Sequence, residues 1–479
     1  MKNSLKANII YQMIYEVLLL ILPFITSPYI ARVLGAEGLG IFSYSVSFAY
    51  YFVIICSLGL KTFGNRLIAQ VRDDELKLNE AFSNLFFLHI GISSVVLISY
   101  IVFVLKFATY KTYAAIQIIY VLSAFFDISW LYFGIEEFKL TVKINSLIRI
   151  LNVICVFWFV KTSNDLPIYC LIYALGMFIA QFVLWFPLKR YVRIVKPKLR
   201  TMISYLKPMI ILFIPVVAVS LYKYMDKIMI GNLASTTELG FYENAEKTVN
   251  LPTTIVASFG TVMLPKISNL VANDNTSLSD KYMNISMRYI MCLAFALSAG
   301  LAGIGKVFAP IFWGEAFYKS GMIIMLLSLT IPFVAYANII RTQYLMPKSR
   351  DKEYLISVSI GALINLFINY MLIPQMGALG AAIGTIVAEA TVSVVQNLLI
   401  SSDFKFTIYI KDFLFFAVSA LVMFWIVYFI GKVMKLSIIT LFLQVFVGIA
   451  CYSMPIFIYL IKTKDEIIKE MLNKLKARL

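Results

Sequence analysis

Long apolar runs separated by short polar connections dominate this chain of 479 residues. About fourteen of the runs reach the roughly 20 residues with which an α-helix crosses a bilayer. They are continuous, whereas the strands of a membrane barrel alternate in hydrophobicity over about ten residues. The pattern therefore predicts an all-α polytopic membrane protein. We expect its membrane helices at 8–33, 38–60, 81–105, 113–134, 140–161, 166–188, 208–231, 238–263, 283–305, 320–346, 354–373, 377–400, 413–431 and 438–461.

The composition excludes a soluble enzyme. Hydrophobic residues make up 61% of the chain and charged residues 14%, against about 45–50% and 25% in soluble domains. The one histidine, His89, lies among apolar neighbours, where we expect it to pack, and the five cysteines form no metal-binding pair. The sequence also lacks a P-loop for ATP hydrolysis. We therefore expect neither enzymatic activity nor a cofactor or metal.

The distribution of the basic residues along the chain predicts the membrane topology. The net charge of +17, from 42 Lys and Arg against 25 Asp and Glu, would indicate nucleic-acid binding in a soluble protein. Sorted by the predicted connections, about 29 of the basic residues fall on one side of the membrane and about nine on the other. Because positive residues gather on the cytoplasmic side, we expect cytoplasmic termini and no nucleic-acid partner. The basic tail 462–479 carries apolar residues at helical spacing, which predicts an amphipathic helix on the membrane surface.

A faint internal repeat divides the chain into two halves. Pro23 and the segment 39–42 recur as Pro215 and 239–242, and a second pair of segments recurs at a similar offset. Two six-helix units in the same orientation predict a pseudo-two-fold axis along the membrane normal and a central cavity. The predicted parts are an N-terminal six-helix bundle at 1–188, a hinge-like basic cytoplasmic connection at 189–207, a C-terminal six-helix bundle at 208–400, two additional transmembrane helices within 401–461 and the cytoplasmic tail 462–479.

Cations at membrane depth are the first candidates for a site. An ionisable residue there costs at least about 2.5–3.5 kcal/mol on insertion scales, so each one needs a reason. Arginine and lysine in a low dielectric suit phosphate or pyrophosphate. The alternative for the arginines is snorkelling to a headgroup, and the alternative for the lysine is a neutral pair with Asp226 one helical turn away. The candidate substrate-binding residues are Arg32, Arg149, Lys223 and Arg341.

Carboxylates at membrane depth are candidates for coupling transport to a proton or sodium gradient. These residues are Asp127, Asp226 and Glu389. Their alternative role is that of a hydrogen-bonded interior carboxyl. Prolines within the predicted spans would let the helices bend, as alternating access across the membrane demands.

The segment PFITSPYIARVLGAEGLGIFSYS at 23–45 resembles the polysaccharide-unit flippases of the Wzx type. These proteins belong to the multidrug/oligosaccharidyl-lipid/polysaccharide exporter superfamily, and weaker similarity continues through 57–74, 125–139 and 222–247. The resemblance implies a multi-pass protein of the bacterial cytoplasmic membrane. Such a protein moves an undecaprenyl-pyrophosphate-linked oligosaccharide repeat unit by alternating access, for capsule, O-antigen or exopolysaccharide export. The implied partners are this lipid-linked oligosaccharide, membrane lipids, a polysaccharide polymerase and export machinery.

Three other functions fit part of the pattern. A lipid II flippase of the same fold would differ only in its cargo. A cation-coupled multidrug antiporter would be expected to concentrate carboxylates rather than cations in its cavity. A membrane-bound polymerase or acyltransferase usually needs a sizeable external loop or an intramembrane histidine, whereas the loops here are short.

Overall fold

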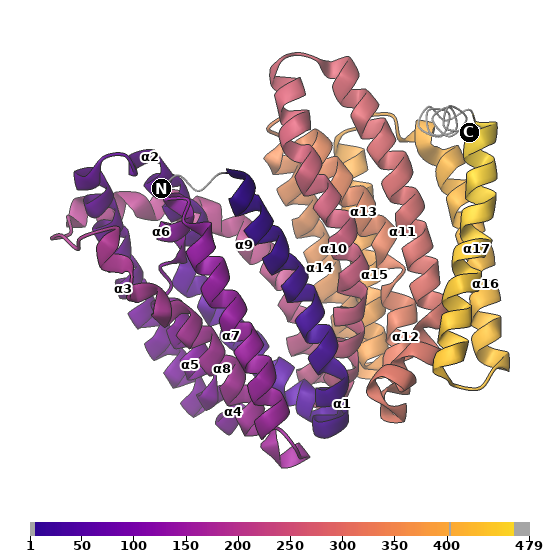
Figure 1. Ribbon diagram of the computed structural model, residues 1–479, viewed down its shortest axis with the longest axis horizontal. Coiled ribbons are helices and arrows are strands. Elements are labelled where there is room, and N and C mark those ends of the chain that lie inside the picture. The colour runs from indigo at the N-terminus through magenta and orange to yellow at the C-terminus, as the bar shows by residue number, and fades with distance from the viewer. Residues whose placement is uncertain (1–4, 402–403, 464–479) are drawn as a thin grey trace. The chain divides into compact units, whose positions relative to one another are not determined.

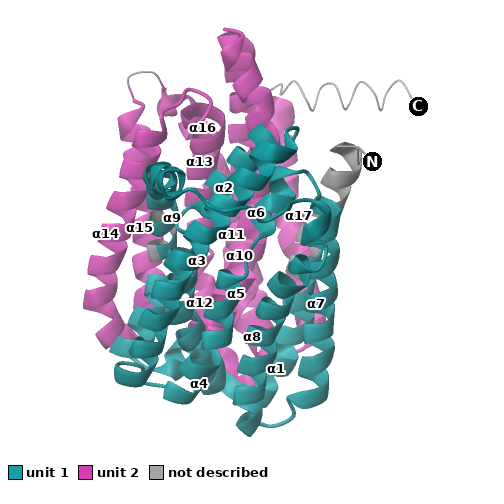
Figure 2. Cartoon of the chain, turned by 90° about the vertical axis from the view of Figure 1, so that its left-hand side faces the viewer, with its two compact units in different colours: residues 1–240 teal, residues 241–479 magenta. Residues whose placement is uncertain are grey.

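The computed structural model describes residues 5–401 and 404–463. Two compact units divide the chain, residues 1–240 and residues 241–479 (Figure 2). The predicted bundles divide earlier, within 189–207, and their boundaries remain an expectation. The predicted amphipathic helix at 462–479 falls almost entirely outside the described residues.

Membrane-spanning helices account for most of the described chain. Twelve helical segments are long and apolar enough to cross a bilayer, and a pair bent by 42°, Glu315–Leu327 with Thr330–Leu345, makes a thirteenth. One of the twelve, Ile21–Val71, has 51 residues, which is more than twice the roughly 20 that one crossing needs. Gly35 interrupts it with a positive φ of 68°. The expected all-α fold with about fourteen crossings is thereby confirmed.

Unit 1 is built from packed helices whose order follows the predicted spans (Figure 1). The predicted span at 113–134 is divided into three short helices, and a helix that the hydropathy pattern did not separate, α2, follows the second crossing. The helices are α1 (Leu5–Ser57), α2 (Leu60–Val71), α3 (Glu75–Lys106), α4 (Lys111–Ile116), α5 (Ile118–Phe125), α6 (Ser129–Gly134), α7 (Phe138–Phe159), α8 (Leu166–Phe182) and α9 (Leu199–Leu233).

Unit 2 begins within the long helix α10 (Thr236–Ala272). A five-residue π-helix, Arg341–Leu345, continues α13 and ends the bent crossing. The last two helices, α16 and α17, pack on α11 around buried Phe416, Met423 and Tyr452. The remaining helices of this unit are α11 (Thr276–Trp313), α12 (Tyr318–Leu327), α13 (Thr330–Ile340), α14 (Asp351–Met376), α15 (Ala378–Leu399), α16 (Ile410–Val433) and α17 (Ile438–Lys462).

The basic connection predicted as a hinge is hydrogen-bonded to unit 1. Residues 192–198 have no regular secondary structure, and α9 begins directly after them. Three of their backbone amides, those of Arg193, Val195 and Lys198, donate to side chains of α3 at 2.7–2.9 Å. The acceptors are the side-chain oxygens of Asn79, Ser83 and Asn84. These side chains supply the hydrogen-bond partners that the backbone of an extended segment outside a sheet otherwise lacks.

Within unit 1, matching positions of the sequence repeat meet. A Cβ atom built on Gly40 would lie 1.7 Å from the carbonyl oxygen of Thr236, and one built on Gly240 would lie 1.8 Å from that of Ala36. Thr236 precedes Gly240 by one helical turn, and Ala36 precedes Gly40 by one helical turn. The contact between the two segments is therefore reciprocal. Only the absence of side chains at both glycines allows the two backbones to approach this closely.

Candidate functional site

A buried carboxylate lies at a helix break in unit 1. The apolar run of the fourth crossing stops being helical between α5 and α6, and Asp127 occupies this break with only 6% of its surface exposed. Its Oδ1 accepts a hydrogen bond from the backbone amide of Ser129 at 2.9 Å. The carboxylate thus pairs with an amide at the start of α6, where the positive end of the helix dipole also favours a negative charge.

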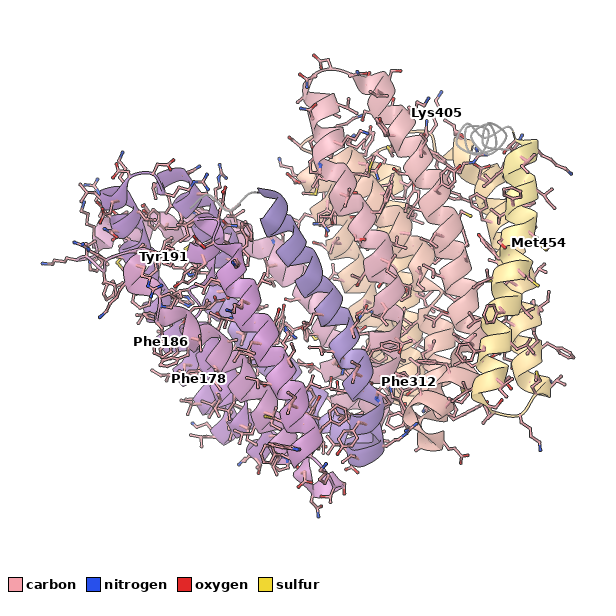
Figure 3. The ribbon with its side chains drawn as sticks, in the orientation of Figure 1. Phe178, Phe186, Tyr191, Phe312, Lys405 and Met454 are labelled. Carbon is pink, nitrogen blue, oxygen red and sulfur yellow. The ribbon has the colours of Figure 1, made fainter. Side chains whose placement is uncertain are left out.

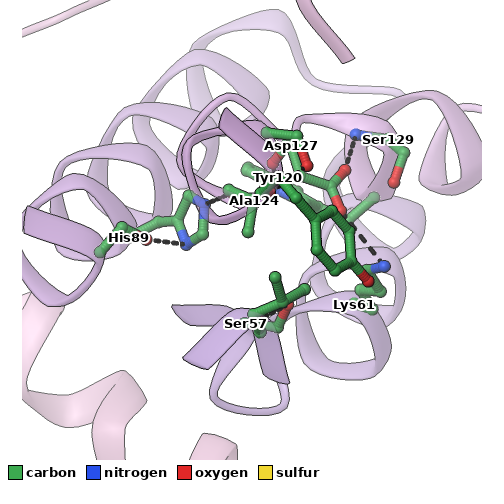
Figure 4. Close-up of polar contacts among 11 residues, drawn as sticks. Ser57, Lys61, His89, Tyr120, Ala124, Asp127 and Ser129 are labelled. Atoms are coloured by element: carbon green, nitrogen blue, oxygen red, sulfur yellow. Dashed lines mark hydrogen bonds and ion pairs between the residues drawn. The ribbon is translucent and has the colours of Figure 1, made fainter. Parts of the chain in front are cut away.

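Lys61 of α2 supplies the countercharge. Its ammonium Nζ lies 3.3 Å from Asp127 Oδ2, as the close-up shows (Figure 4). The two partners differ in exposure, because the side chain of Lys61 is 63% exposed and that of Asp127 only 8%. The pair thus joins a buried acceptor to a cation that reaches water or a ligand. Asp127 is held as the interior carboxyl that the sequence offered as the alternative, and its part in ion coupling stays a prediction.

A cleft of about 600 Å³ opens beside this pair. It is polar and basic on the side of α2, where Thr62, Asn65 and Arg66 join Lys61, and aromatic on the side of α6. The ring of Trp130 closes the aromatic side and donates its Nε1–H to the carbonyl oxygen of Asp127 at 3.1 Å. A cleft with two cations, an amide and a hydroxyl can bind an oxyanion such as phosphate.

Small residues let α2 and α6 pack closely enough to shape this cleft. A Cβ atom on Gly64 would lie 2.9 Å from the Trp130 ring, and one on Gly134 would lie 2.6 Å from Ile68. The Trp130 ring in turn stacks on Phe82 of α3, with centroids 5.4 Å apart. The cleft therefore rests on a rigid aromatic core.

His89 belongs to the supporting structure. It is 2% exposed, its Nε2 lies 2.8 Å from the carbonyl oxygen of Ala124, and its Nδ1 lies 3.4 Å from Ser93 Oγ (Figure 4). Both ring nitrogens are occupied, one by Ala124 of α5 and the other by Ser93 one turn along α3 itself. The expectation of a packed histidine is confirmed.

An ion pair fixes the far end of α2. Arg72 Nη1 lies 2.6 Å from Glu136 Oε1 in the turn between α6 and α7. This hydrogen bond raises the pKa of the Arg72 guanidinium above its ordinary value. The pair is exposed and adds little to stability, and it joins the end of α2 to the turn before α7.

Unit 2 holds a second polar cluster, at the π-helix. Arg341 begins this segment, and its guanidinium carbon lies 4.6 Å from the centroid of the Tyr354 ring. Its Nε is buried without a hydrogen-bond partner among the described residues. A cation–π contact leaves the hydrogen-bonding groups of an arginine available for an anion.

Two neighbours of Arg341 along the chain also carry buried, unpaired polar atoms in the described part. These are the Oδ1 of Asn338 and both side-chain amide atoms of Gln343, a residue that is 2% exposed. Gly260 of α10 faces this cluster, since a Cβ atom there would lie 2.2 Å from Asn338 Oδ1. Buried polar atoms without partners are rare and mark sites for water or ligand, and π-helical turns are frequent at functional sites.

The other candidate cations lie apart from these clusters. Arg32 is exposed, three residues before the break at Gly35. Arg149 is half-buried on α7, eleven residues before Val160, whose carbonyl accepts from the Tyr29 hydroxyl of α1 at 2.6 Å. Eleven helical residues rise about 16 Å, so Arg149 lies well inside the span that α7 forms. Arg32 lies near the end of the first crossing, on α1. The backbone of Lys223 is part of α9, but its side chain falls outside the described residues.

The two remaining carboxylates occupy different units. Asp226 is 3% exposed on α9, and Glu389 is half-buried on α15. Both have interactions within the protein. The pairing of Asp226 with Lys223 therefore stays a prediction, as does the role of either carboxylate in ion coupling.

Lys61 and Arg66 are not among the site residues predicted from the sequence. Both lie in a predicted cytoplasmic connection, because the segment that forms α2 is too polar to be predicted as a span. The available signal was the spacing of buried Leu60, Gly64 and Ile68, which repeats every four residues and marks one buried helix face. Lys61 and Arg66 lie off that face, toward the cleft.

Fold and site together define a multi-pass membrane protein with basic side chains in its polar clusters. Among solved structures, the lipid II flippase MurJ in an inward closed conformation is similar, with a TM-score of 0.78 at 16% identity over 95% of this chain and 99% of that chain. An inward-facing multidrug MATE transporter gives a TM-score of 0.61 at 14% identity over 77% of this chain and 93% of that chain. These likenesses confirm the fold.

Sequence comparisons identify the family. The family model described as polysaccharide biosynthesis protein matches residues 5–271. The chain belongs to this family, which confirms the kinship predicted from residues 23–45. It is 22% identical over 393 residues to a Shigella dysenteriae protein named as an O-antigen transporter, covering 81% of this chain and 98% of the relative. It is also 22% identical over 451 residues to a Haloferax volcanii protein named as the low-salt glycan biosynthesis flippase Agl15, covering 91% and 92% respectively.

Proposed function

We propose that the protein is a flippase that carries an undecaprenyl-pyrophosphate-linked oligosaccharide repeat unit across the bacterial cytoplasmic membrane by alternating access. One observation carries the proposal: each unit holds a cluster of polar side chains that contains basic residues. These are Lys61 with Arg66 beside their cleft, and Arg341 at the π-helix. A pyrophosphate offers the matching charge and several acceptor oxygens.

The names of the relatives support this cargo class. Both named relatives concern glycan transport, and each is covered over more than nine-tenths of its length. The product would supply O-antigen, capsule or exopolysaccharide synthesis. A polysaccharide polymerase and export machinery on the other side of the membrane are the partners that such a product requires. No covalent step belongs to this function.

The charge bias supports the orientation. With both termini in the cytoplasm, the cleft beside α2 faces the cytoplasmic side, where a lipid-linked oligosaccharide is assembled. Lys61 and Arg66 would then act at loading, because the predicted topology puts the segment that lines their cleft in a cytoplasmic connection. Arg341 is reached later, since its guanidinium is packed on Tyr354.

A lipid II flippase is the second candidate, and the likeness to MurJ favours it through the fold alone. Depletion of the protein in its own organism separates the two, followed by mass spectrometry of the extracted pyrophosphate-linked saccharides. We expect an undecaprenyl-pyrophosphate-linked oligosaccharide to accumulate. Accumulated lipid II would establish the second candidate instead. Unchanged lipids together with lost export of a cationic dye would establish a multidrug antiporter.

Complementation assigns the residues. An Arg341→Ala chain should fail to restore surface glycan in depleted cells, while a Lys435→Ala chain, altered at an exposed lysine between α16 and α17, should restore it. Immunoblots of isolated membranes must show equal amounts of both variants. Full restoration by Arg341→Ala would remove this residue from the substrate path.

A further inference from the structure

Unit 2 contains an apolar cavity that the transport proposal does not use. It encloses about 760 Å³ among α11, α12, α13, α15 and α16. Aromatic and aliphatic side chains form nearly all of its wall, among them Phe295, Phe333, Phe413 and Phe424. Its size lies within the 300–1,000 Å³ typical of pockets that bind a small molecule.

Most of the few polar side chains in the wall are hydrogen-bonded to one another or to the backbone. The Tyr336 hydroxyl donates to Asn397 Oδ1 at 3.0 Å, and the Ser393 hydroxyl donates to the Phe333 carbonyl oxygen at 2.9 Å. No charged residue lines the cavity. The cavity therefore suits a hydrocarbon chain, because a polar molecule would lose its hydration without gaining hydrogen bonds.

The cavity opens to the surface of the bundle. Three of its lining residues, Val394, Leu398 and Leu421, are exposed by 55%, 64% and 58%. These side chains belong to membrane-spanning helices, so the solvent that they meet is the hydrocarbon of the bilayer. A lipid chain can enter sideways between α15 and α16.

The cavity lies toward one end of the membrane. On α16 its lining residues run from Phe413 to Phe424, a rise of about 16 Å, or roughly half of a 30 Å hydrocarbon core. On α15 they run from Ile386 to Leu398, which is the end of α15 next to the connection that leads to α16. A chain bound here belongs to one leaflet, which the charge bias predicts to be the cytoplasmic one.

A cation stands beside that end. Lys405 directly precedes Phe406, which lines the cavity, and Lys405 is exposed at the end of unit 2 opposite to Phe312 (Figure 3). The nearest carboxylate along α16, that of Asp412, is occupied by Arg288 at 2.9 Å and by the Tyr459 hydroxyl at 2.6 Å. In the sequence 403–412, Lys405 and Lys411 stand against Asp403 and the already paired Asp412, so the local charge is positive, as an anionic headgroup requires.

We propose that this cavity holds one acyl chain of a resident anionic phospholipid, whose phosphate pairs with Lys405. A transported lipid fits less well, because the cavity reaches only half of the bilayer and its wall comes from unit 2 alone. The lipid fills space that would otherwise leave α16 without packing partners on this side. The proposal is independent of the cargo, since the site shares no residue with the polar clusters.

Native mass spectrometry of the purified full chain tests the proposal. The protein is exchanged into detergent with phosphatidylglycerol, phosphatidylcholine or undecaprenyl phosphate, and bound lipid is counted after delipidation. We expect one phosphatidylglycerol to remain. Ala417→Trp fills the cavity and should abolish retention, whereas Val418→Trp, at a position that is 57% exposed and outside the cavity wall, should not. Lys405→Gln should weaken retention about five-fold, the effect of one lysine at an anionic surface, whereas Lys432→Gln at the other end of α16 should not.

Three outcomes would overturn the proposal. Equal retention by Ala417→Trp and Val418→Trp would place the bound lipid elsewhere. Equal retention of phosphatidylcholine and phosphatidylglycerol would remove the headgroup site. Preferred retention of undecaprenyl phosphate would make the cavity part of the transport path. Comparable melting temperatures of the two tryptophan variants establish that a loss of lipid is not a loss of fold.

Discussion

Gly40→Ala tests the reciprocal glycine contact of unit 1. The added methyl group would lie 1.7 Å from the carbonyl oxygen of Thr236, whereas real Cβ atoms essentially never approach a heavy atom within 3.0 Å. The two backbones must therefore separate by at least about 1.3 Å at this point. The obstacle is a backbone oxygen, so no side-chain rotation relieves the clash. Because Ala36 and Gly240 form the other half of the contact, the separation also loosens that half.

The expected cost lies at the upper end of the overpacking range, about 2–3 kcal/mol. In a chain of this length that corresponds to a lower melting temperature by roughly 2–3 °C. A thiol-reactive fluorescent dye suits the measurement, because the five cysteines are free and none is exposed. The dye reports unfolding in detergent as these thiols become accessible.

Gly91→Ala is the matched control. Gly91 lies in α3 of the same unit, and a Cβ atom there would meet nothing within 4 Å. Since alanine is the better helix former by about 1 kcal/mol, this variant should melt at the wild-type temperature or slightly above it. Gly240→Ala should resemble Gly40→Ala. If Gly40→Ala melted no lower than Gly91→Ala, the close backbone approach would not exist in the folded protein.

Three further predictions concern charges. Lys61→Met and Asp127→Asn form a double-mutant cycle measured by melting temperature, in which we expect a coupling energy of about 1 kcal/mol. The coupling is small because the lysine is exposed and its attraction to the carboxylate is screened. Additive effects of the two substitutions would show that the ion pair does not form. Arg341→Lys should restore surface glycan only partly in depleted cells, because lysine cannot combine ring stacking with a bidentate contact to phosphate; complete restoration would refute that role. Asp74 caps α3 by accepting from the amides of Leu76 and Lys77 at 3.1 Å, and chiefly the Lys77 amide lowers the pKa of its carboxyl. This contribution to stability is complete above the unfolded-state pKa of about 3.9 and is lost as the pH falls through the lower folded-state pKa. The melting temperatures of wild type and Asp74→Ala should therefore differ at pH 6 and converge near pH 3, and a constant difference would be inconsistent with the cap.

Hydropathy predicts the membrane helices well because one physical quantity, the thickness of the hydrocarbon core, decides their length. The predicted span 377–400 and the observed α15 at Ala378–Leu399 illustrate the agreement. Two local features escape the same reasoning. The break at Asp127 contains neither glycine nor proline, and the π-helix Arg341–Leu345 itself consists of residues that are common in ordinary α-helices. Tertiary packing, rather than local preference, produces them.

The candidate site was predictable in its buried members and not in its exposed ones. Asp127 and Arg341 interrupt apolar runs, so their cost in hydrocarbon draws attention to them. Lys61 lies in a polar segment, where a lysine is ordinary, and its partner is 66 residues away in the sequence. Only the fold brings such a pair together.

The attachment of residues 192–198 to α3 has a consequence for how this segment tolerates change. Asn79, Ser83 and Asn84 accept hydrogen bonds from backbone amides, so these bonds do not depend on which side chains stand at 193, 195 and 198. Substitutions there can alter the local charge, and with it the fit to a given membrane surface, while the path of the chain is preserved. Proline is the exception, because it removes the amide hydrogen. Positions 193 and 195 can thus vary in composition, whereas the three acceptors on α3, the ion pair of Lys198 with Glu80 and the buried Val192 constrain the rest of the segment.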